Sequence, residues 1–224
     1  MYSGPHHVFL PYGQDRWFVD YAWIHRRLYD LFLGVSISGQ NFKGLALETA
    51  VGQRSSVLPQ GRCKALDGTE RQIDCAYSVG DHLVVVECKA VGRSIGYDRG
   101  DPEAILYRQK NVVDRGLNEA DAKAVWIAER PTGRNYDISR FRDVLPIAVS
   151  PFVEFIPSKS SRYWISSDVA RVLTPEGLRE VLNNPGILEN AMNRIPVVPA
   201  RGELWNWERN GVMYIRAGEG IEGE

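Results

Sequence analysis

Residues 82–91 read HLVVVECKAV, an apolar run that carries two charges, Glu87 and Lys89. A short apolar run of this kind, rich in β-branched residues, is typical of a buried strand. An ion buried in such a strand is costly unless it is paired or binds a metal. The two charges therefore indicate either a functional site or an ion pair, and the neighbouring sequence helps to decide between them.

The residues before this run predict a β-hairpin. Residues 71–78 (RQIDCAYS) alternate as a strand would, and Gly80–Asp81 fits a two-residue loop. A glycine in the first central position is what a type II′ turn prefers. With these two residues as the loop, Val79 faces His82 across the hairpin, and the rest of the register follows.

In that register Asp74 faces Glu87. Facing side chains lie on one face of a sheet, and Lys89, two residues beyond Glu87, lies on the same face. We therefore expect Asp74, Glu87 and Lys89 to lie together at one end of a sheet.

Two facing carboxylates repel each other unless a cation lies between them. A partial set of oxygen ligands suits Mg²⁺, with Mn²⁺ as an alternative. Lys89 would then orient or deprotonate a water molecule, or stabilise negative charge on a phosphate. The alternative from the residues alone is an exposed ion pair between Glu87 and Lys89, worth less than about 1 kcal/mol.

An Asp followed by Glu-X-Lys on the next strand resembles the PD-(D/E)XK nuclease superfamily. The resemblance rests on RQIDCAY, with Asp74, and on VVVECKAV, with Glu87 and Lys89, although Ile73 stands in the nominal proline position. It covers roughly half of the chain. It implies a Mg²⁺-dependent enzyme that hydrolyses phosphodiester bonds, with DNA favoured over RNA as the nucleic acid partner.

The resemblance also implies a fuller set of metal ligands. The backbone carbonyl of Cys88 would join Asp74 and Glu87, and Glu48, in the preceding helix, would be a further ligand. Together with Lys89, these side chains form the expected catalytic set.

The same family implies an α/β fold, a restriction-endonuclease-like α-β-β-β-α-β core around a mixed sheet. The chain can be read in that order. A helix is expected over 42–52, then an extended stretch at 56–66 and the hairpin. A second helix is expected from its cap Asp101 to Gly116. Strands are expected over 122–129 (AKAVWIAE) and within 145–156.

Three regions are therefore predicted: an N-terminal extension at 1–41, the nuclease-like core at 42–157, and C-terminal helices with a hairpin at 158–224. The extension contains a helix-like pattern over 14–33. Its wide aromatic stripe requires a large partner surface, either the core, a second copy of the chain or a larger protein. The C-terminal region is predicted to contain helices over 174–184 and 185–195 and a hairpin over 203–217.

Cations gather in the sequence around the expected site. Residues 89–115 contain six Lys or Arg against four Asp or Glu, although the whole chain has a net charge of −1. Such a local surplus is suited to phosphate contact. The residues predicted to contact nucleic acid are Arg93, Arg99, Arg108, Gln109 and Lys110.

The composition argues against other classes of protein. The three cysteines, Cys63, Cys75 and Cys88, include no CxxC pair, which argues against a disulfide framework or a zinc site. No apolar run approaches the length of a membrane span, and the N-terminus lacks the pattern of a signal peptide. We therefore expect a cytoplasmic protein that does not enter a membrane.

A function of another class stays open. The chain could be a nuclease-like scaffold that binds protein or nucleic acid without catalysis. Its docking surfaces would be the aromatic N-terminal helix and the hairpin that carries Trp205 and Trp207. Intact charges in a buried strand favour the enzyme, because a scaffold has no need to keep them.

Overall fold

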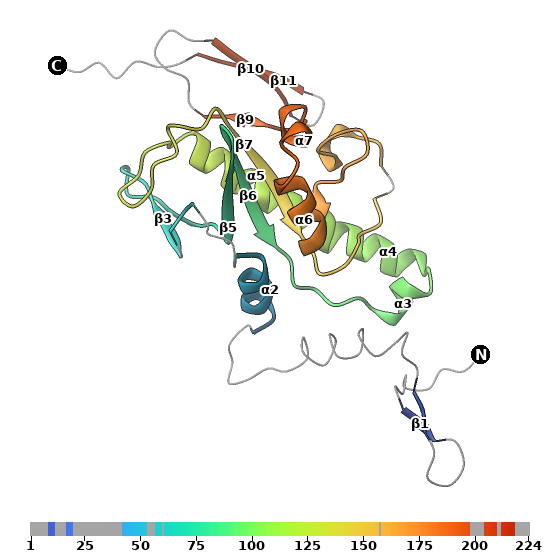
Figure 1. Ribbon diagram of the computed structural model, residues 1–224. Coiled ribbons are helices and arrows are strands. Elements are labelled where there is room, and N and C mark those ends of the chain that lie inside the picture. Colours follow the sequence, from blue (N-terminus) through green and yellow to red (C-terminus); the bar gives the residue numbers. More distant parts are fainter. Residues whose placement is uncertain are drawn as a thin grey trace, which may run out of the picture. The chain divides into compact units, whose positions relative to one another are not determined.

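The structure is a computed structural model, shown in Figure 1. It describes residues 9–11, 17–19, 42–52, 57–59, 61–156, 158–197, 204–209 and 212–217. The chain divides into two compact units, Met1–Leu45 and Ala46–Glu224, which are considered separately.

The first unit contains a short antiparallel pair of strands. Strand β1 (Phe9–Pro11) pairs with β2 (Trp17–Val19). The helix predicted over 14–33 is therefore wrong at residues 17–19, where two aromatic residues and a valine favour a strand. The remainder of that predicted helix lies outside the described residues.

The second unit is built on a mixed sheet of five strands, as an α/β fold requires. Four of them lie side by side in the order β5-β6-β7-β8, and the short β9 pairs with β7. Strands β6 and β7 are parallel, as are β7 and β8, whereas β5 and β9 run antiparallel to their neighbours. The strands are β5 (Cys75–Val79), β6 (His82–Cys88), β7 (Asp143–Val149), β8 (Val172–Leu173) and β9 (Ile195–Pro196).

The hairpin register predicted from the turn is confirmed. Val79 pairs with His82, and Cys75 pairs with Val86. Gly80 has a φ of 59°, which is the left-handed conformation that the first loop position of a type II′ turn needs. Asp74 lies in the bend immediately before β5, so the expected strand over 71–78 is split there.

The residues before that bend form a separate two-stranded sheet. Strand β3 (Arg62–Lys64) pairs antiparallel with β4 (Glu70–Gln72). These strands do not pair with the central sheet among the described residues.

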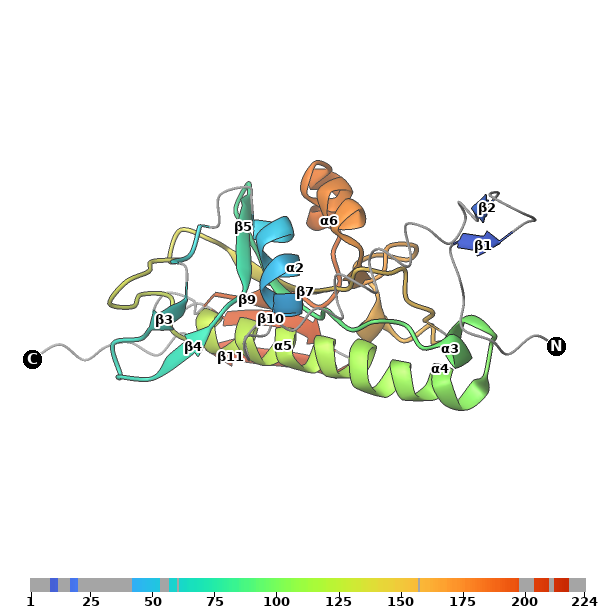
Figure 2. The same ribbon diagram turned by 90° about the horizontal axis from the view of Figure 1, so that it is seen from below.

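Helices cover the two faces of the central sheet (Figure 2). Leu83 and Val85 of β6 pack in one core with residues of α5 (Arg115–Ala128). The alternate residues Val84 and Val86 pack in a second core. That second core includes residues of α2 (Phe42–Gly52) and α6 (Pro175–Leu182). Alternation along β6 therefore directs Glu87 to the face that α5 covers.

Helix α5 is the last part of a long continuous helical segment. After α3 (Ile95–Asp98), the chain runs through α4 (Pro102–Arg108), a π-helical stretch at Gln109–Asp114, and α5. The predicted start is confirmed, because the Asp101 side chain accepts a hydrogen bond from the Glu103 backbone N–H at 3.0 Å.

The predicted end of that helix at Gly116 is wrong, and so is the strand predicted over 122–129. Gly116 is buried inside the helical segment, where a Cβ would lie 3.2 Å from both Ala148 Cβ and Lys89 Cγ. The glycine therefore allows the helix to approach the sheet closely. The apolar residues after it are buried at helical spacing: Leu117, Ala120, Ala124 and Ile127.

The C-terminal part follows its predictions more closely. Thr174 caps α6, accepting a hydrogen bond from the Gly177 backbone N–H at 3.1 Å. The next helix, α7, covers only Pro185–Glu189, shorter than the expected 185–195. Strands β10 (Leu204–Arg209) and β11 (Val212–Ala217) form the predicted antiparallel hairpin. Among the described residues, no helix is long and apolar enough to cross a membrane.

A buried ion pair anchors α5 to the far edge of the sheet. Arg171, with 0% of its surface exposed, pairs with Asp121 of α5. The same guanidinium donates hydrogen bonds to the backbone carbonyls of Pro146, at 3.1 Å, and Arg162, at 2.9 Å. The position of α5 on the sheet thus depends on a fully buried charge.

Replacing Arg171 with Met should lower the free energy of unfolding by about 3–5 kcal/mol, because it leaves the Asp121 carboxylate buried without its partner. The matched control is Arg179→Met, which breaks an exposed pair with Glu176 and should cost less than about 1 kcal/mol. Urea denaturation of both variants measures the difference. Equal losses would show that Arg171 does not anchor the helix.

Candidate active site

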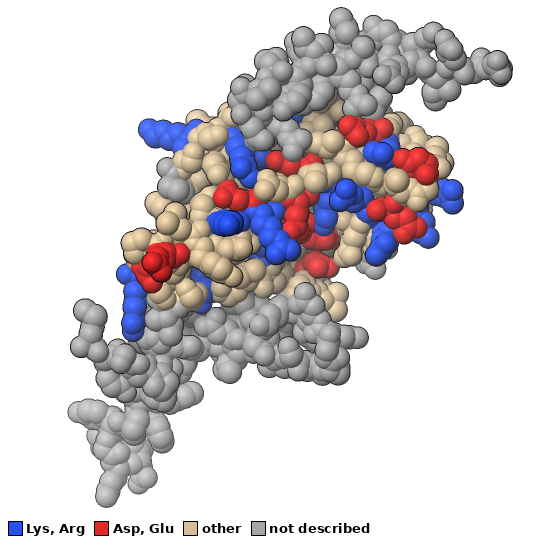
Figure 3. All heavy atoms as spheres, turned by 180° about the vertical axis from the view of Figure 1, so that it is seen from behind, with Lys and Arg blue, Asp and Glu red and all other residues tan. Residues whose placement is uncertain are grey.

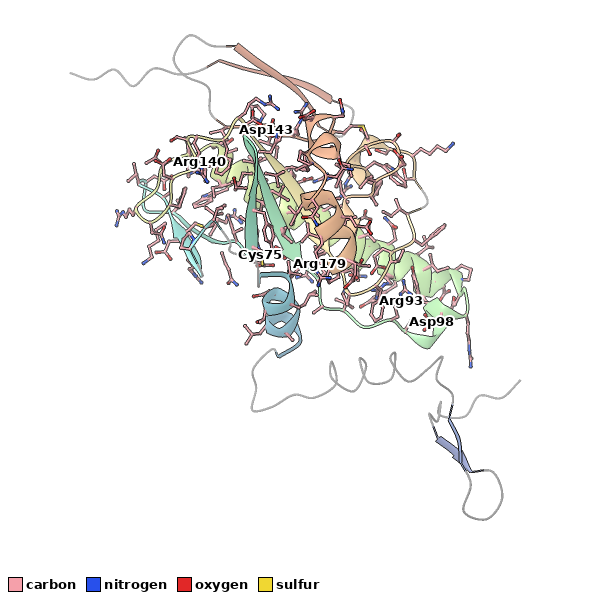
Figure 4. The ribbon with its side chains drawn as sticks, in the orientation of Figure 1. Cys75, Arg93, Asp98, Arg140, Asp143 and Arg179 are labelled. Atoms are coloured by element: carbon pink, nitrogen blue, oxygen red, sulfur yellow. The ribbon has the colours of Figure 1, made fainter. Side chains whose placement is uncertain are left out.

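The candidate site lies where β6 ends, at the end of the sheet that Cys75 marks in Figure 4. Glu87, near the end of β6, is 4% exposed. Asp74 is held beside it, because the Asp74 Oδ2 atom accepts a hydrogen bond from the Cys88 backbone N–H at 2.9 Å. The bend before β5 and the last residues of β6 therefore bring the two carboxylates together.

Both carboxylates contact one ammonium group, that of Lys123 on α5. The Lys123 Nζ atom lies 3.0 Å from Asp74 Oδ1 and also donates a hydrogen bond to Glu87 Oε2. The predicted convergence of Asp74 and Glu87 on one cation position is thus present, and a lysine of the chain supplies the cation.

Lys89 lies on the other side of Glu87. Its Nζ atom is 2.7 Å from Glu87 Oε1 and 2.5 Å from Glu119 Oε2. Glu119 in turn accepts a hydrogen bond from Arg115 Nε at 2.7 Å. Positive and negative groups therefore alternate across the site, from Arg115 at its exposed end to Asp74 at its buried end.

This arrangement shifts the pKa values of the buried groups. Burial and the charge of Asp74 raise the pKa of Glu87, although both lysines oppose the shift. Burial alone would lower the pKa of Lys123, but the charges of Glu87 and Asp74 outweigh it and raise that pKa. For Lys89, bonds to Glu119 and Glu87 outweigh burial in the same way. Both lysines are therefore held protonated at neutral pH.

Glu48, on α2, is near enough to Asp74 and Lys123 for their charges to affect its carboxyl group. Burial and the charge of Asp74 raise the pKa of Glu48, and the charge of Lys123 acts in the opposite direction. Among the described residues, however, no group of three or more His, Cys, Asp or Glu side chains is placed to hold a metal. The two oxygens of Asp74 and Glu87 that contact Lys123 would offer a divalent ion a partial set of ligands.

The residues predicted to contact nucleic acid have different environments. Arg108 is buried and pairs with Glu154 through two hydrogen bonds, from Nε at 2.6 Å and from Nη2 at 2.5 Å. A guanidinium used in this way is not presented to a phosphate, so Arg108 is better explained as a structural residue. Gln109 is partly buried and donates a hydrogen bond to Asp114 Oδ1 at 3.3 Å.

The other three cations lie nearer the surface. Arg93 follows the end of β6 and stacks on Tyr97 and Phe152, with its guanidinium carbon 5.0 and 4.9 Å from the ring centres. Arg99 and Lys110 are exposed. In Figure 3, Lys and Arg are interspersed with Asp and Glu on the face shown, so the described residues of that face form no uniformly basic surface.

Two residues of the site, Glu119 and Lys123, were not predicted from the sequence. They lie four residues apart on α5, one helical turn, which places both on the face toward the sheet. The pattern Glu119–Lys123 could have signalled a charged helix face, but the strand predicted over 122–129 concealed it.

Comparisons with known proteins add no evidence. No protein-family model matches the chain, and no curated protein or solved structure matches it. The chemistry of the site is therefore argued from its own geometry.

Glu119→Gln should make stability less dependent on pH. Burial would raise the pKa of Glu119, but bonds from Lys89 and Arg115 outweigh it and lower the pKa to about 2. A depressed carboxyl pKa stabilises the fold above the ordinary value of 4.5, and this contribution is lost as the pH falls toward 2.

Urea midpoints of the wild type and Glu119→Gln should differ at pH 6 and converge as the pH falls toward 3. The effect should be modest, because the Glu119 side chain is 37% exposed and solvent screens its charge. A difference that stayed constant over this range would contradict the assigned role of Glu119.

Proposed function

We propose that the chain is a metal-dependent nuclease that hydrolyses phosphodiester bonds, with DNA favoured as the substrate. The observation that carries this proposal is the convergence of Asp74 and Glu87 on one cation position with Lys89 beside it. Buried acidic and basic groups gathered at the end of a sheet are typical of a functional site.

The fold gives further support to a restriction-endonuclease-like core. An antiparallel hairpin, β5–β6, brings both carboxylates together. It is followed by a long helical segment and by β7, which lies parallel to β6. The order of two strands, a helix and a strand agrees with the last four elements of the expected α-β-β-β-α-β arrangement. Helix α2 precedes the hairpin in the chain.

Asp74 and Glu87 would hold Mg²⁺ or Mn²⁺, with the Cys88 carbonyl and Glu48 as further ligands. When bound, a divalent ion activates a water molecule and stabilises charge on the phosphate. The chain itself supplies the orientation: the Cys88 N–H fixes one Asp74 oxygen, which leaves the other to face the cation position.

Lys89 would act as a positioned cation. Glu87 and Glu119 hold its ammonium on two sides, and its raised pKa keeps it protonated. A protonated lysine cannot accept a proton from water. It can donate a hydrogen bond to the attacking water or to a phosphate oxygen, and its charge opposes the negative charge that develops in the transition state.

One observation favours the alternative, a nuclease-like scaffold that binds without catalysis. Lys123 already neutralises the two carboxylates, so the buried charges are satisfied without a metal. In that function the site would be an internal ion cluster. The hairpin β10–β11, which carries Trp205 and Trp207, would be a docking surface.

A cleavage assay separates the two functions. The wild type should cleave DNA with Mg²⁺ or Mn²⁺ and should be inactive in EDTA. Asp74→Asn, Glu87→Gln and Lys89→Ala should each lose at least about 100-fold in rate, because the first two remove a proposed metal ligand and the third removes the cation that opposes the charge of the transition state. The control Lys159→Met removes an exposed charge outside the site and should retain activity.

Plasmid, linear duplex and single-stranded DNA should be tested beside RNA, so that substrate preference is measured in the same assay. Cleavage by Asp74→Asn or Glu87→Gln at the wild-type rate would refute the assignment of the site. Binding without cleavage of any substrate would favour the scaffold.

A further inference from the structure

We infer that Lys123 is a built-in counter-ion, that its ammonium lies where a metal ion would bind between Asp74 and Glu87, and that a divalent ion must displace it. This inference rests on the proposed metal site, and it adds a residue that controls how tightly the site binds its ion. Lys123 is the lysine that contacts both Asp74 and Glu87, whereas Lys89 contacts Glu87 and Glu119.

The geometry makes the two occupants mutually exclusive. The Lys123 Nζ atom contacts the same oxygen of Asp74 and the same oxygen of Glu87 that face the shared cation position. A bound Mg²⁺ would lie about 2.0–2.1 Å from such oxygens. An ammonium 3.0 Å from Asp74 Oδ1 would then repel the ion at very short range. Metal binding therefore requires the ammonium to leave.

The fold explains why a cation is needed there when no metal is bound. The Asp74 and Glu87 side chains are only 7% and 5% exposed. Two carboxylates buried side by side without a cation would repel each other and pay the cost of burial. The Lys123 ammonium offsets both the repulsion and the cost of burial, so the protein can fold without a bound metal ion.

Lys123 can leave without moving its helix. Helix α5 is anchored by the buried pair of Asp121 and Arg171, whereas the Lys123 side chain is 15% exposed and has a flexible four-carbon stem. Rotation of that side chain is enough to free the carboxylates.

The test measures Mn²⁺ affinity in the absence of nucleic acid, by calorimetric titration. Lys123→Met keeps the unbranched shape and most of the length of the side chain and removes its charge. It should bind Mn²⁺ at least about tenfold more tightly than the wild type, because no charge-assisted bonds must be broken. Lys123→Arg keeps the charge and should bind no more tightly than the wild type. The gain should vanish in Asp74→Asn/Lys123→Met.

Circular dichroism, with and without Mn²⁺, shows whether each variant is folded. If Lys123→Met folds only when Mn²⁺ is added, the ion has replaced the missing ammonium, which supports the inference. If Lys123→Met folds neither with nor without Mn²⁺, the Mn²⁺ affinity of Lys123→Arg becomes the deciding measurement. Tighter binding of Mn²⁺ by Lys123→Arg than by the wild type would overturn the inference.

The two proposals fail in different ways. Equal Mn²⁺ affinity of the wild type and Lys123→Met, or weaker binding by the variant, would overturn the role of Lys123 and leave the metal site standing. Absence of Mn²⁺ binding by both proteins would overturn the metal site and the inference together. The control Lys159→Met should match the wild type, and a gain there would show that loss of charge alone explains the effect.

Discussion

Two buried carboxylates and the cation between them determine how the second unit is put together. Asp74 comes from the bend before β5, Glu87 from β6 and Lys123 from α5, so one ion cluster joins three separate segments. The cluster is stable only when its charges balance, because burial removes the water that would otherwise screen them. The helix must therefore lie over the end of the hairpin, whatever the function of the site.

Two further features of the fold hold α5 in that position. Gly116 lets the helical segment approach Ala148 of the sheet. The buried pair of Arg171 and Asp121 joins α5 to the segment that directly precedes β8. A helix held so firmly can present Lys123 and Glu119 at fixed positions. Because α5 is held in this way, displacement of the Lys123 ammonium by a metal ion would require only its side chain to move.

Local sequence signals were enough to predict the hairpin and its register, because a two-residue loop at Gly80–Asp81 fixes every pair that follows. The observed register ends at the pair Cys75–Val86, but the bend at Asp74 keeps its carboxylate beside Glu87, so extending the register by one pair was enough to predict the proximity. Helix α5 could not be predicted in the same way. Gly116 resembled a helix end, and the short apolar run after it fits either a strand or a buried helix.

The involvement of Lys123 depends on tertiary packing. No rule of local spacing connects a helical lysine to carboxylates 36 and 49 residues away. The sequence therefore predicted the acidic half of the site, and the packing of α5 on the sheet was needed to identify the cation that balances it.

The most direct measurement of the central claim is an anomalous difference map from crystals soaked in Mn²⁺. The account predicts one peak bound by the carboxylate oxygens of Asp74 and Glu87, with the Lys123 ammonium moved away from both. A map with Lys123 still bridging the two carboxylates, and with Mn²⁺ absent from them, would contradict the claim that this cluster is a metal site.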